Sequence, residues 1–306
     1  MTQRLETKIG PLILRNPIML ASGTCGYGQE LSDFIDFTQL GGIVVKGTTL
    51  EARSGNATPR IFETPSGMLN AIGLQNQGVD DVIAQKLPWL QQFSGLSILV
   101  NVCGSKIEDY AEVSRRISNS GLAHAIELNI SCPNIKEGGI EFGIRADMAA
   151  QVTRACVSVS KIPIFVKLSP NVAMVDQIKI GAAVMEAGAA GLSMINTLVG
   201  MMVDVEKRIP RLATVTGGLS GPAIKPVALA QIHRVYQALK VPIVGMGGIE
   251  SLEDVYSFAL VGAAAVQIGT STFIRPDAAA QLLSHLDHDL RRRSQTFASF
   301  VGGIQV

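Results

Sequence analysis

Eight short runs of apolar residues, rich in Val and Ile, constrain the fold of this chain more than any other feature of its sequence. Gly or Pro lies at or next to the ends of these runs, which are PIMLASG (17–23), GGIVVKGTT (41–49), LSILVNVCG (96–104), AIELNISCP (125–133), PIFVKLSP (163–170), GLSMINT (191–197), PIVGMGGI (242–249) and AAAVQIGTS (263–271). A strand that is buried on both faces gives such a continuous run, whereas a half-exposed strand alternates apolar and polar residues. The runs therefore predict eight strands of a parallel sheet.

Amphipathic stretches of helical length separate most of these runs, for example at 106–121, 147–160 and 173–188. Asp147 and Ser251 are expected to be helix N-caps, and Pro222 is expected at a first helical position. Eight strands that alternate with helices predict an α/β protein of the TIM, or (β/α)8, barrel class. A doubly wound open sheet is the alternative, but it usually has fewer strands and a GxGxxG motif, whose spacing GTCGYG at 23–28 does not have.

Two segments stand outside the regular alternation. ETKIGPLILRN, before the first run, predicts a short hairpin that closes the bottom of the barrel. Residues 50–78 form a long insertion after the second strand, and loops of this length are usually functional. Since no internal repeat or linker is visible, residues 1–306 are expected to form a single domain.

Charge and cysteine content argue against several classes of protein. The net charge is +1 and the densest basic run is Arg291–Arg293, so no nucleic-acid partner is expected. The four cysteines are scattered with no CxxC pair, so neither a disulfide framework nor a metal or iron–sulfur site is expected. With no apolar signal segment and no run of 18 apolar residues, we expect a cytoplasmic protein without a membrane span.

Polar residues and glycines occupy the C-terminal ends of the predicted strands, where a TIM barrel has its active site. They are Ser22-Gly23, Lys46-Gly47, Asn101, Asn129 with Ser131 and Cys132, Lys167, Asn196-Thr197, Gly247-Gly248 and Gly269-Thr270. Buried Lys and Asn side chains need polar partners, which a bound ligand can supply. The two glycine turns after the last strands, together with Ser220-Gly221-Pro222 before a helix, favour a phosphate site over simple tight turns. The residues alone therefore predict a phosphate-bearing ligand above a rim of Lys and Asn.

Several segments taken together resemble dihydroorotate dehydrogenase over essentially the whole chain. They are ELNISCPN with IKEGGIEFG, VVKGTT, NAIGLQN (70–76), FVKLSP, INT, GMGGI and QIGTS. The Gly-rich continuation after SCPN, a Cys rather than a Ser at 132, and the absence of an N-terminal membrane-associating extension resemble the type B catalytic subunit, which passes electrons ultimately to NAD.

This resemblance implies an oxidoreductase of de novo pyrimidine (UMP) biosynthesis that oxidises dihydroorotate to orotate, with one FMN per chain at the barrel mouth and no metal. It implies FMN contacts from Ser22, Lys46, Gly47, Asn101, Asn129, Lys167, Ile195, Gly221, Gly247, Gly248, Gly269 and Thr270. It implies substrate contacts from Lys46, Asn70, Ala71, Ile72, Gly73, Leu74, Asn129, Asn134, Asn196 and Thr197.

The chemistry of these residue types agrees with the implied roles. Cys132 is implied as the base that takes a proton from C5 while a hydride leaves C6 for FMN, a role that needs its thiolate. Lys167 would supply positive charge where reduced flavin gathers negative charge. Asn side chains both donate and accept, which suits the alternating C=O and N–H edge of a pyrimidine. Cys25, Cys103 and Cys156 are given no role.

The resemblance also implies partners. Two catalytic subunits would form a homodimer and associate with an electron-transfer subunit that carries FAD and [2Fe–2S], giving a heterotetramer. Three alternatives stay open: a fumarate-linked type A dihydroorotate dehydrogenase, another FMN pyrimidine reductase such as the reductase domain of dihydropyrimidine dehydrogenase, and a flavin-free phosphate-binding barrel.

Overall fold

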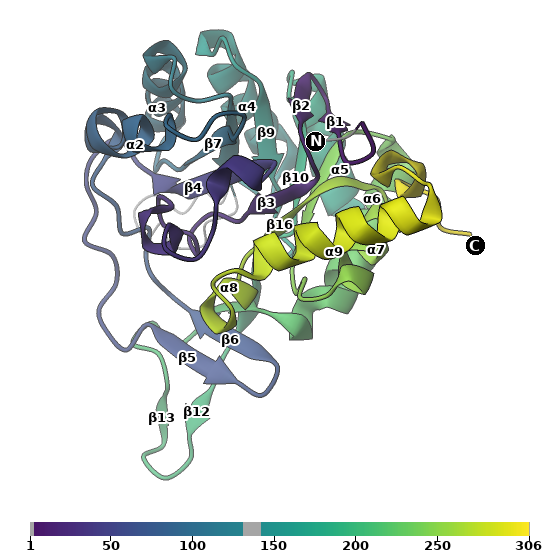
Figure 1. Cartoon of the computed structure of the whole chain (residues 1–306). Coiled ribbons are helices and arrows are strands. Elements are labelled where there is room, and N and C mark those ends of the chain that lie inside the picture. Colours follow the sequence, from purple (N-terminus) through teal and green to yellow (C-terminus); the bar gives the residue numbers. More distant parts are fainter. Residues whose placement is uncertain (1–2, 131–141, 306) are drawn as a thin grey trace.

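A closed parallel barrel forms the centre of the molecule (Figure 1). The computed structural model describes residues 3–130 and 142–305. The barrel strands are β3 (Ile18–Leu20), β4 (Gly42–Thr48), β7 (Ser97–Val102), β8 (Ala125–Asn129), β9 (Ile164–Lys167), β10 (Gly191–Met194), β15 (Ile243–Met246) and β16 (Ala263–Ile268). Each strand pairs with the next one along the chain, and β16 pairs with β3 to close the ring. Every strand lies within one predicted run, so the eight-stranded barrel is confirmed and the open sheet was the wrong alternative.

Helices cover the outside of the barrel. The longer ones are α3 (Ile107–Ser120), α4 (Ala146–Val159), α5 (Met174–Glu186), α6 (Lys225–Leu239), α7 (Leu252–Leu260) and α9 (Ala278–Arg293), and the short ones are α1 (Val79–Asp81), α2 (Leu87–Leu90) and α8 (Ser271–Ile274). The three helices predicted at 106–121, 147–160 and 173–188 correspond to α3, α4 and α5 and are confirmed to within two residues.

The predicted helix starts have different outcomes. Ser251 is the N-cap of α7: its hydroxyl accepts from the Asp254 N–H, and the Asp254 carboxylate accepts from the Ser251 N–H. Pro222 begins a single 3₁₀ turn that leads directly into α6, as expected. The prediction for Asp147 was wrong, because α4 begins at Ala146 and Arg145 is its N-cap. Asp147 lies instead in the first turn, where its negative charge is favourable at the positive end of the helix dipole.

Side chains of the barrel strands alternate between two separate cores, as the period of two along a strand requires. Residues such as Ile126 and Leu128 of β8 face the helices and belong to the large outer core. A smaller core fills the barrel and consists of Ile9, Leu14, Met19, Val44, Leu99, Ala125, Phe165, Val244 and Ala265. Ile9 and Leu14 come from the antiparallel hairpin of β1 (Thr7–Ile9) and β2 (Leu12–Leu14). The hairpin therefore closes the bottom of the barrel, as predicted.

A small antiparallel sheet, formed by two insertions, lies at the other end of the barrel. Its strand order is β11-β14-β6-β5, where β5 (Ile61–Thr64) and β6 (Gly67–Asn70) belong to the predicted insertion at 50–78. The other two strands, β11 (Leu198–Gly200) and β14 (Gly217–Ser220), belong to a second insertion after β10 that was not predicted. Between them, β12 (Val203–Asp204) and β13 (Ile209–Pro210) form a hairpin that projects from the molecule (Figure 1).

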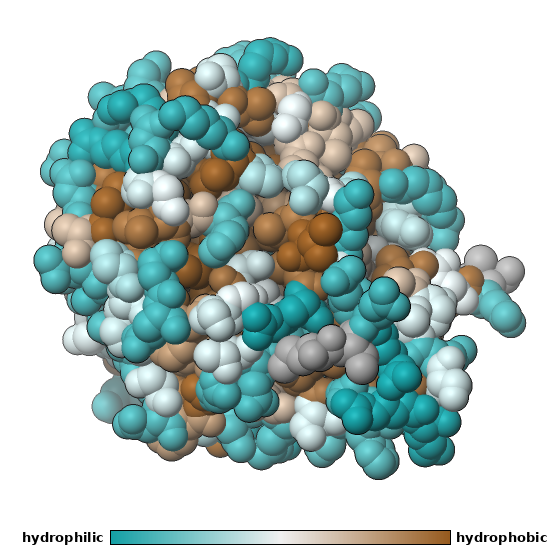
Figure 2. Space-filling view, turned by 45° about the horizontal axis from the view of Figure 1, so that its top comes forward, coloured by the Kyte–Doolittle hydropathy of each residue, from teal (hydrophilic) through white to brown (hydrophobic). Residues whose placement is uncertain are grey.

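The surface view shows hydrophilic side chains over most of the rim of the visible face, with apolar side chains in separate patches towards its middle (Figure 2). Among residues 3–130 and 142–305, no helix has the length and apolar character needed to cross a membrane.

Candidate active site

A cavity of about 540 Å³ opens at the C-terminal ends of the barrel strands, and β6, β11 and β14 contribute part of its wall. Its volume falls within the range of roughly 300–1,000 Å³ that is common for small-molecule sites. All of the residues expected to contact FMN line it: Ser22, Lys46, Gly47, Asn101, Asn129, Lys167, Ile195, Gly221, Gly247, Gly248, Gly269 and Thr270. So do Asn70, Ala71, Ile72, Gly73, Leu74, Asn196 and Thr197 from the substrate set. Residues distant in sequence are thus brought to one cavity.

Three residues that the sequence singled out lie outside the part of the chain that the structure describes. They are Ser131, Cys132, the expected base, and Asn134, an expected substrate contact. Asn129, the last residue of β8, lines the cavity three positions before Cys132 in the sequence.

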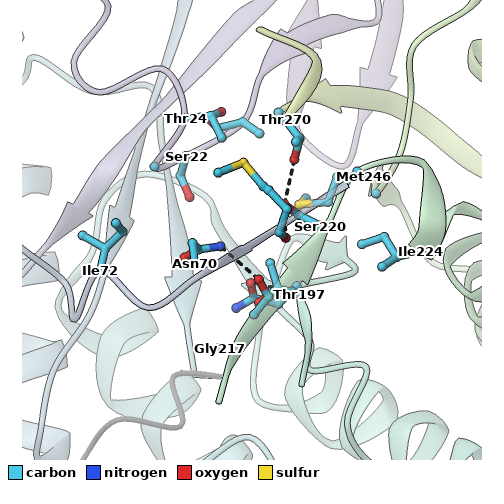
Figure 3. Close-up of a pocket in the computed structure, with 18 of the residues that line it drawn as sticks. Ser22, Thr24, Asn70, Ile72, Thr197, Gly217, Ser220, Ile224, Met246 and Thr270 are labelled. Carbon is cyan, nitrogen blue, oxygen red and sulfur yellow. Dashed lines mark hydrogen bonds between the residues drawn. The ribbon is translucent and has the colours of Figure 1, made fainter. Parts of the chain in front are cut away.

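Glycine turns form one wall of the cavity. Gly221, Gly247 and Gly248 have φ values of +93°, +123° and +78°, a region that L-residues with side chains rarely adopt. A Cβ atom on Gly248 would lie 2.7 Å from the carbonyl oxygen of Gly221, so a side chain there would fill the space between the two turns. Thr270 Oγ1 donates to Ser220 Oγ over 2.8 Å and ties the turn after β16 to this wall (Figure 3).

The chain beyond Gly221 turns into Pro222–Ile224 and then α6, so a helix N-terminus stands beside the glycine turns. Exposed backbone N–H groups and a positive helix end are the features that bind phosphate in many proteins. This wall therefore fits the phosphate of a nucleotide cofactor.

Charged and amide side chains form the floor of the cavity. Asn101, Glu127, Lys167 and Gln267 each stand two residues beyond a member of the apolar barrel core, on the same face of their strands. Asn101 Nδ2 donates to Glu127 Oε1 over 2.7 Å, and Gln267 Nε2 donates to Glu127 Oε2 over 2.8 Å. The Lys167 ammonium lies 3.5 Å from Glu127 Oε1. A polar layer thus lies directly on the apolar one.

Glu127 is fully buried and remains ionised at neutral pH. Burial raises the pKa of its carboxyl, but the Lys167 ammonium and hydrogen bonds such as that from Gln267 lower it further, so the pKa lies below its ordinary value. The sequence reasoning missed Glu127 and Gln267. The available signal was a single carboxylate within the apolar run AIELNI. Glu127 stands two residues before Asn129, which places both side chains on the same face of the strand.

Three asparagine amides form a series beside this floor. Asn129 Nδ2 donates to Asn101 Oδ1, and Asn196 Nδ2 donates to Asn129 Oδ1, each over 3.4 Å. The Thr197 N–H donates to Asn196 Oδ1 over 2.8 Å. Asn70, at the end of β6 in the small sheet, donates from its amide to the carbonyl of Gly218 (Figure 3). Amide donors and acceptors from three barrel strands and the small sheet therefore converge on the cavity.

Two further asparagines, which the sequence reasoning also missed, hold the loop that follows β6. Asn56 Nδ2 donates to the carbonyl of Ala71 over 2.9 Å, and Asn76 Nδ2 donates to the carbonyl of Leu74 over 2.7 Å. Leu74 has a positive φ of 57°, so the loop is bent sharply where it lines the cavity. These contacts fix the position of the loop that was expected to contact substrate.

The cysteines that the structure describes are Cys25, Cys103 and Cys156, and all are buried. Burial raises the pKa of Cys25 and of Cys156 to about 12, so both stay protonated near neutral pH. Neither can supply a thiolate base under those conditions.

Comparison with known proteins agrees with this geometry. The family model described as dihydroorotate dehydrogenase matches residues 4–290. A protein of Anoxybacillus flavithermus named dihydroorotate dehydrogenase B (NAD(+)), catalytic subunit, is 55% identical over 283 residues, which are 92% of this chain and 90% of that protein. Proteins with the same name from Geobacillus kaustophilus and Bacillus cereus are 52% identical over 92% of this chain, covering 90% and 91% of their own lengths.

A solved structure described as DHODH in complex with ferulenol, from Eimeria tenella, matches with a TM-score of 0.82. The match covers 99% of this chain and 89% of that chain at 22% identity, which supports the fold alone.

Proposed function

We infer the function from one premise: the chain belongs to the dihydroorotate dehydrogenase family. We propose that it oxidises dihydroorotate to orotate in pyrimidine biosynthesis, as the FMN-binding catalytic subunit of an NAD-linked type B enzyme. The observation that carries the proposal is the cavity at the barrel mouth, which gathers the glycine turns, the lysines and, among the described residues, the asparagines expected to bind cofactor and substrate.

The residues present fit FMN. The glycine turns at Gly221, Gly247 and Gly248 leave a space that a Cβ atom would fill. This space lies beside the N-terminus of α6 and suits a phosphate. Lys46 and Lys167 supply the positive charge that the cofactor's electronics require. When bound there, FMN supplies the acceptor for a hydride.

Oxidation of dihydroorotate forms the C5=C6 double bond by removing a proton from C5 and a hydride from C6. We assign the C5 proton to the thiolate of Cys132, which follows the cavity-lining Asn129 by three residues in sequence. Asn70, Asn129, Asn196 and, beyond Cys132, Asn134 are assigned to orient the pyrimidine ring. An amide can donate to a ring carbonyl and accept from a ring N–H, so a set of amides matches this edge.

One non-covalent FMN per chain is the first expected result. The protein should purify yellow, and denaturation should release FMN in a ratio of about one per chain, because the glycine turns at Gly221, Gly247 and Gly248 form one phosphate-type site in this cavity. Chromatography of the released cofactor with a quantified protein sample makes the measurement. FAD in place of FMN would contradict the assignment of this cavity to FMN, and a protein that stays colourless after incubation with FMN would favour the flavin-free alternative.

The relatives' names describe a catalytic subunit, which implies a partner subunit for them. We propose that this chain likewise associates with an electron-transfer subunit that carries FAD and [2Fe–2S], in a heterotetramer built on a homodimer. Exposed apolar side chains on the second insertion support the homodimer: Val199, Met201, Val203, Val205 and Ile209 have exposed fractions between 46% and 79%. Apolar side chains gathered on one projecting segment are typical of a protein interface.

We also propose that residues 1–306 act as one FMN-binding domain in the cytoplasm, with no nucleic-acid or membrane partner. The small net charge of +1 supports the absence of a nucleic-acid partner. The closed barrel that takes strands from residue 18 to residue 268 supports a single domain.

A further inference from the structure

We propose that Glu127 is a positioning residue for the reaction. Its carboxylate holds the Lys167 ammonium and sets the orientation of asparagine amides at the cavity. Its negative charge also offsets the charge of Lys167 and so lowers the reduction potential of the bound flavin. This inference rests on the proposed function, because it assigns the cavity to FMN and a pyrimidine.

Stability gives no reason for a carboxylate at this position. The layer immediately below it in the barrel is entirely apolar and includes Leu99, Ala125, Phe165 and Ala265. A buried ion pair is often no more stabilising than apolar side chains of similar volume, because both charges lose their hydration. Glu127 thus occupies a place that an apolar residue could fill, next to a cavity that needs defined charge.

The contacts of Glu127 account for both carboxylate oxygens. Oε1 accepts from Asn101 and lies 3.5 Å from the Lys167 ammonium, while Oε2 accepts from Gln267. Lys167 and Gln267 are themselves buried and line the cavity. One carboxylate therefore joins three neighbouring side chains of the floor that come from β7, β9 and β16.

An ionised carboxylate can only accept hydrogen bonds, so it dictates the order of the amides. Asn101 must present its NH₂ group to Glu127, which leaves Asn101 Oδ1 to accept from Asn129. Asn129 Oδ1 then accepts from Asn196. The carboxylate thus sets which group of Asn101, and through it of Asn129, donates and which accepts, and the Thr197 N–H holds Asn196 in the matching orientation.

The charge of Glu127 also offsets that of Lys167. Reduced flavin carries more negative charge than oxidised flavin, so an uncompensated Lys167 would stabilise the reduced form. Glu127→Gln keeps the size of the side chain and removes its charge. We expect this variant to bind reduced FMN at least tenfold more tightly relative to oxidised FMN, which raises the two-electron potential by about 30 mV or more.

Glu127→Asp separates charge from position. It keeps the negative charge but is one methylene shorter, so it cannot reach both Asn101 and Gln267. We expect the ratio of its affinities for reduced and oxidised FMN to differ less than threefold from the wild-type ratio. Its affinity for orotate should fall about tenfold, because the amides lose their fixed donor and acceptor orientation.

The experiment measures flavin midpoint potential, orotate affinity from the flavin absorbance change, and thermal stability for the FMN-loaded chain and its variants. Asp289→Asn is the matched control. Asp289 of α9 is a buried carboxylate that accepts from Tyr256, Arg292 and Arg293, and it does not line the cavity. The control should lose stability without a change in potential or orotate affinity.

An unchanged potential in Glu127→Gln, with lower thermal stability alone, would overturn the proposal and leave Glu127 as a structural residue. If Glu127→Gln does not fold, Glu127→Asp decides: weakened orotate binding supports the proposal, and wild-type affinity overturns it. A wild-type chain that holds FMN but is not reduced by dihydroorotate contradicts the proposed function instead, and the comparison of potentials remains valid.

Discussion

Cys132→Ala should reduce the bound flavin with dihydroorotate roughly two to four decades more slowly than the wild-type chain, since that is the usual contribution of a positioned general base. FMN binding and orotate binding should persist, because neither depends on a thiol. Single-turnover bleaching of the flavin absorbance, recorded without oxygen, is the measurement.

Two further variants control this experiment. Cys132→Ser should be slightly faster than Cys132→Ala, because a hydroxyl can accept a proton, although its high pKa makes it a poor base near neutral pH. Cys156→Ala is the matched control: Cys156 is a buried cysteine of α4 that does not line the cavity, so bleaching should keep its wild-type rate. Near-wild-type bleaching in Cys132→Ala would assign the base to another residue.

The isolated chain should reduce artificial acceptors with dihydroorotate but reduce NAD negligibly. Its sequence has no GxGxxG motif after a strand and no cysteine cluster that could hold an iron–sulfur centre. Among the described residues, no group of three or more His, Cys, Asp or Glu side chains could hold a metal ion. Under the proposed type B assignment, electrons from the flavin reach NAD through a second subunit, so co-purification with that subunit should restore NAD reduction.

Steady-state assays on the separate chain and on the co-expressed complex test this expectation. Robust NAD reduction by the chain alone would refute the type B assignment. Efficient use of fumarate as the acceptor would instead favour the single-subunit type A enzyme.

The barrel could be predicted because its strands are buried on both faces, which leaves an unbroken apolar run for each of them in the sequence. The rim residues could be predicted because a Lys or Asn that ends such a run breaks the apolar pattern at a defined place. In this way Lys46, Asn101 and Lys167 were assigned to one cavity, although their places in the sequence span more than a hundred residues.

Glu127 was not predicted because it lies within a run rather than at its end, and only the closed barrel shows which side chains surround it. The second insertion was missed for a different reason. Its strands are only two to four residues long, too short to show a periodic pattern of apolar residues. One of them, β14, pairs with β6 from a distant part of the chain, and the sequence pattern does not show this pairing. The N-cap of α4 was predicted two residues too late, at Asp147 instead of Arg145, because an acidic residue is favourable both as an N-cap and within the first turn.

The absorbance spectrum of the purified, FMN-loaded chain, recorded without oxygen before and after dihydroorotate is added, tests the central claim most directly. We predict that one equivalent of dihydroorotate bleaches the visible flavin bands and yields one equivalent of orotate, with no NAD and no partner subunit present. A flavin that dithionite bleaches but that dihydroorotate leaves unchanged would contradict the assignment of this cavity to dihydroorotate oxidation.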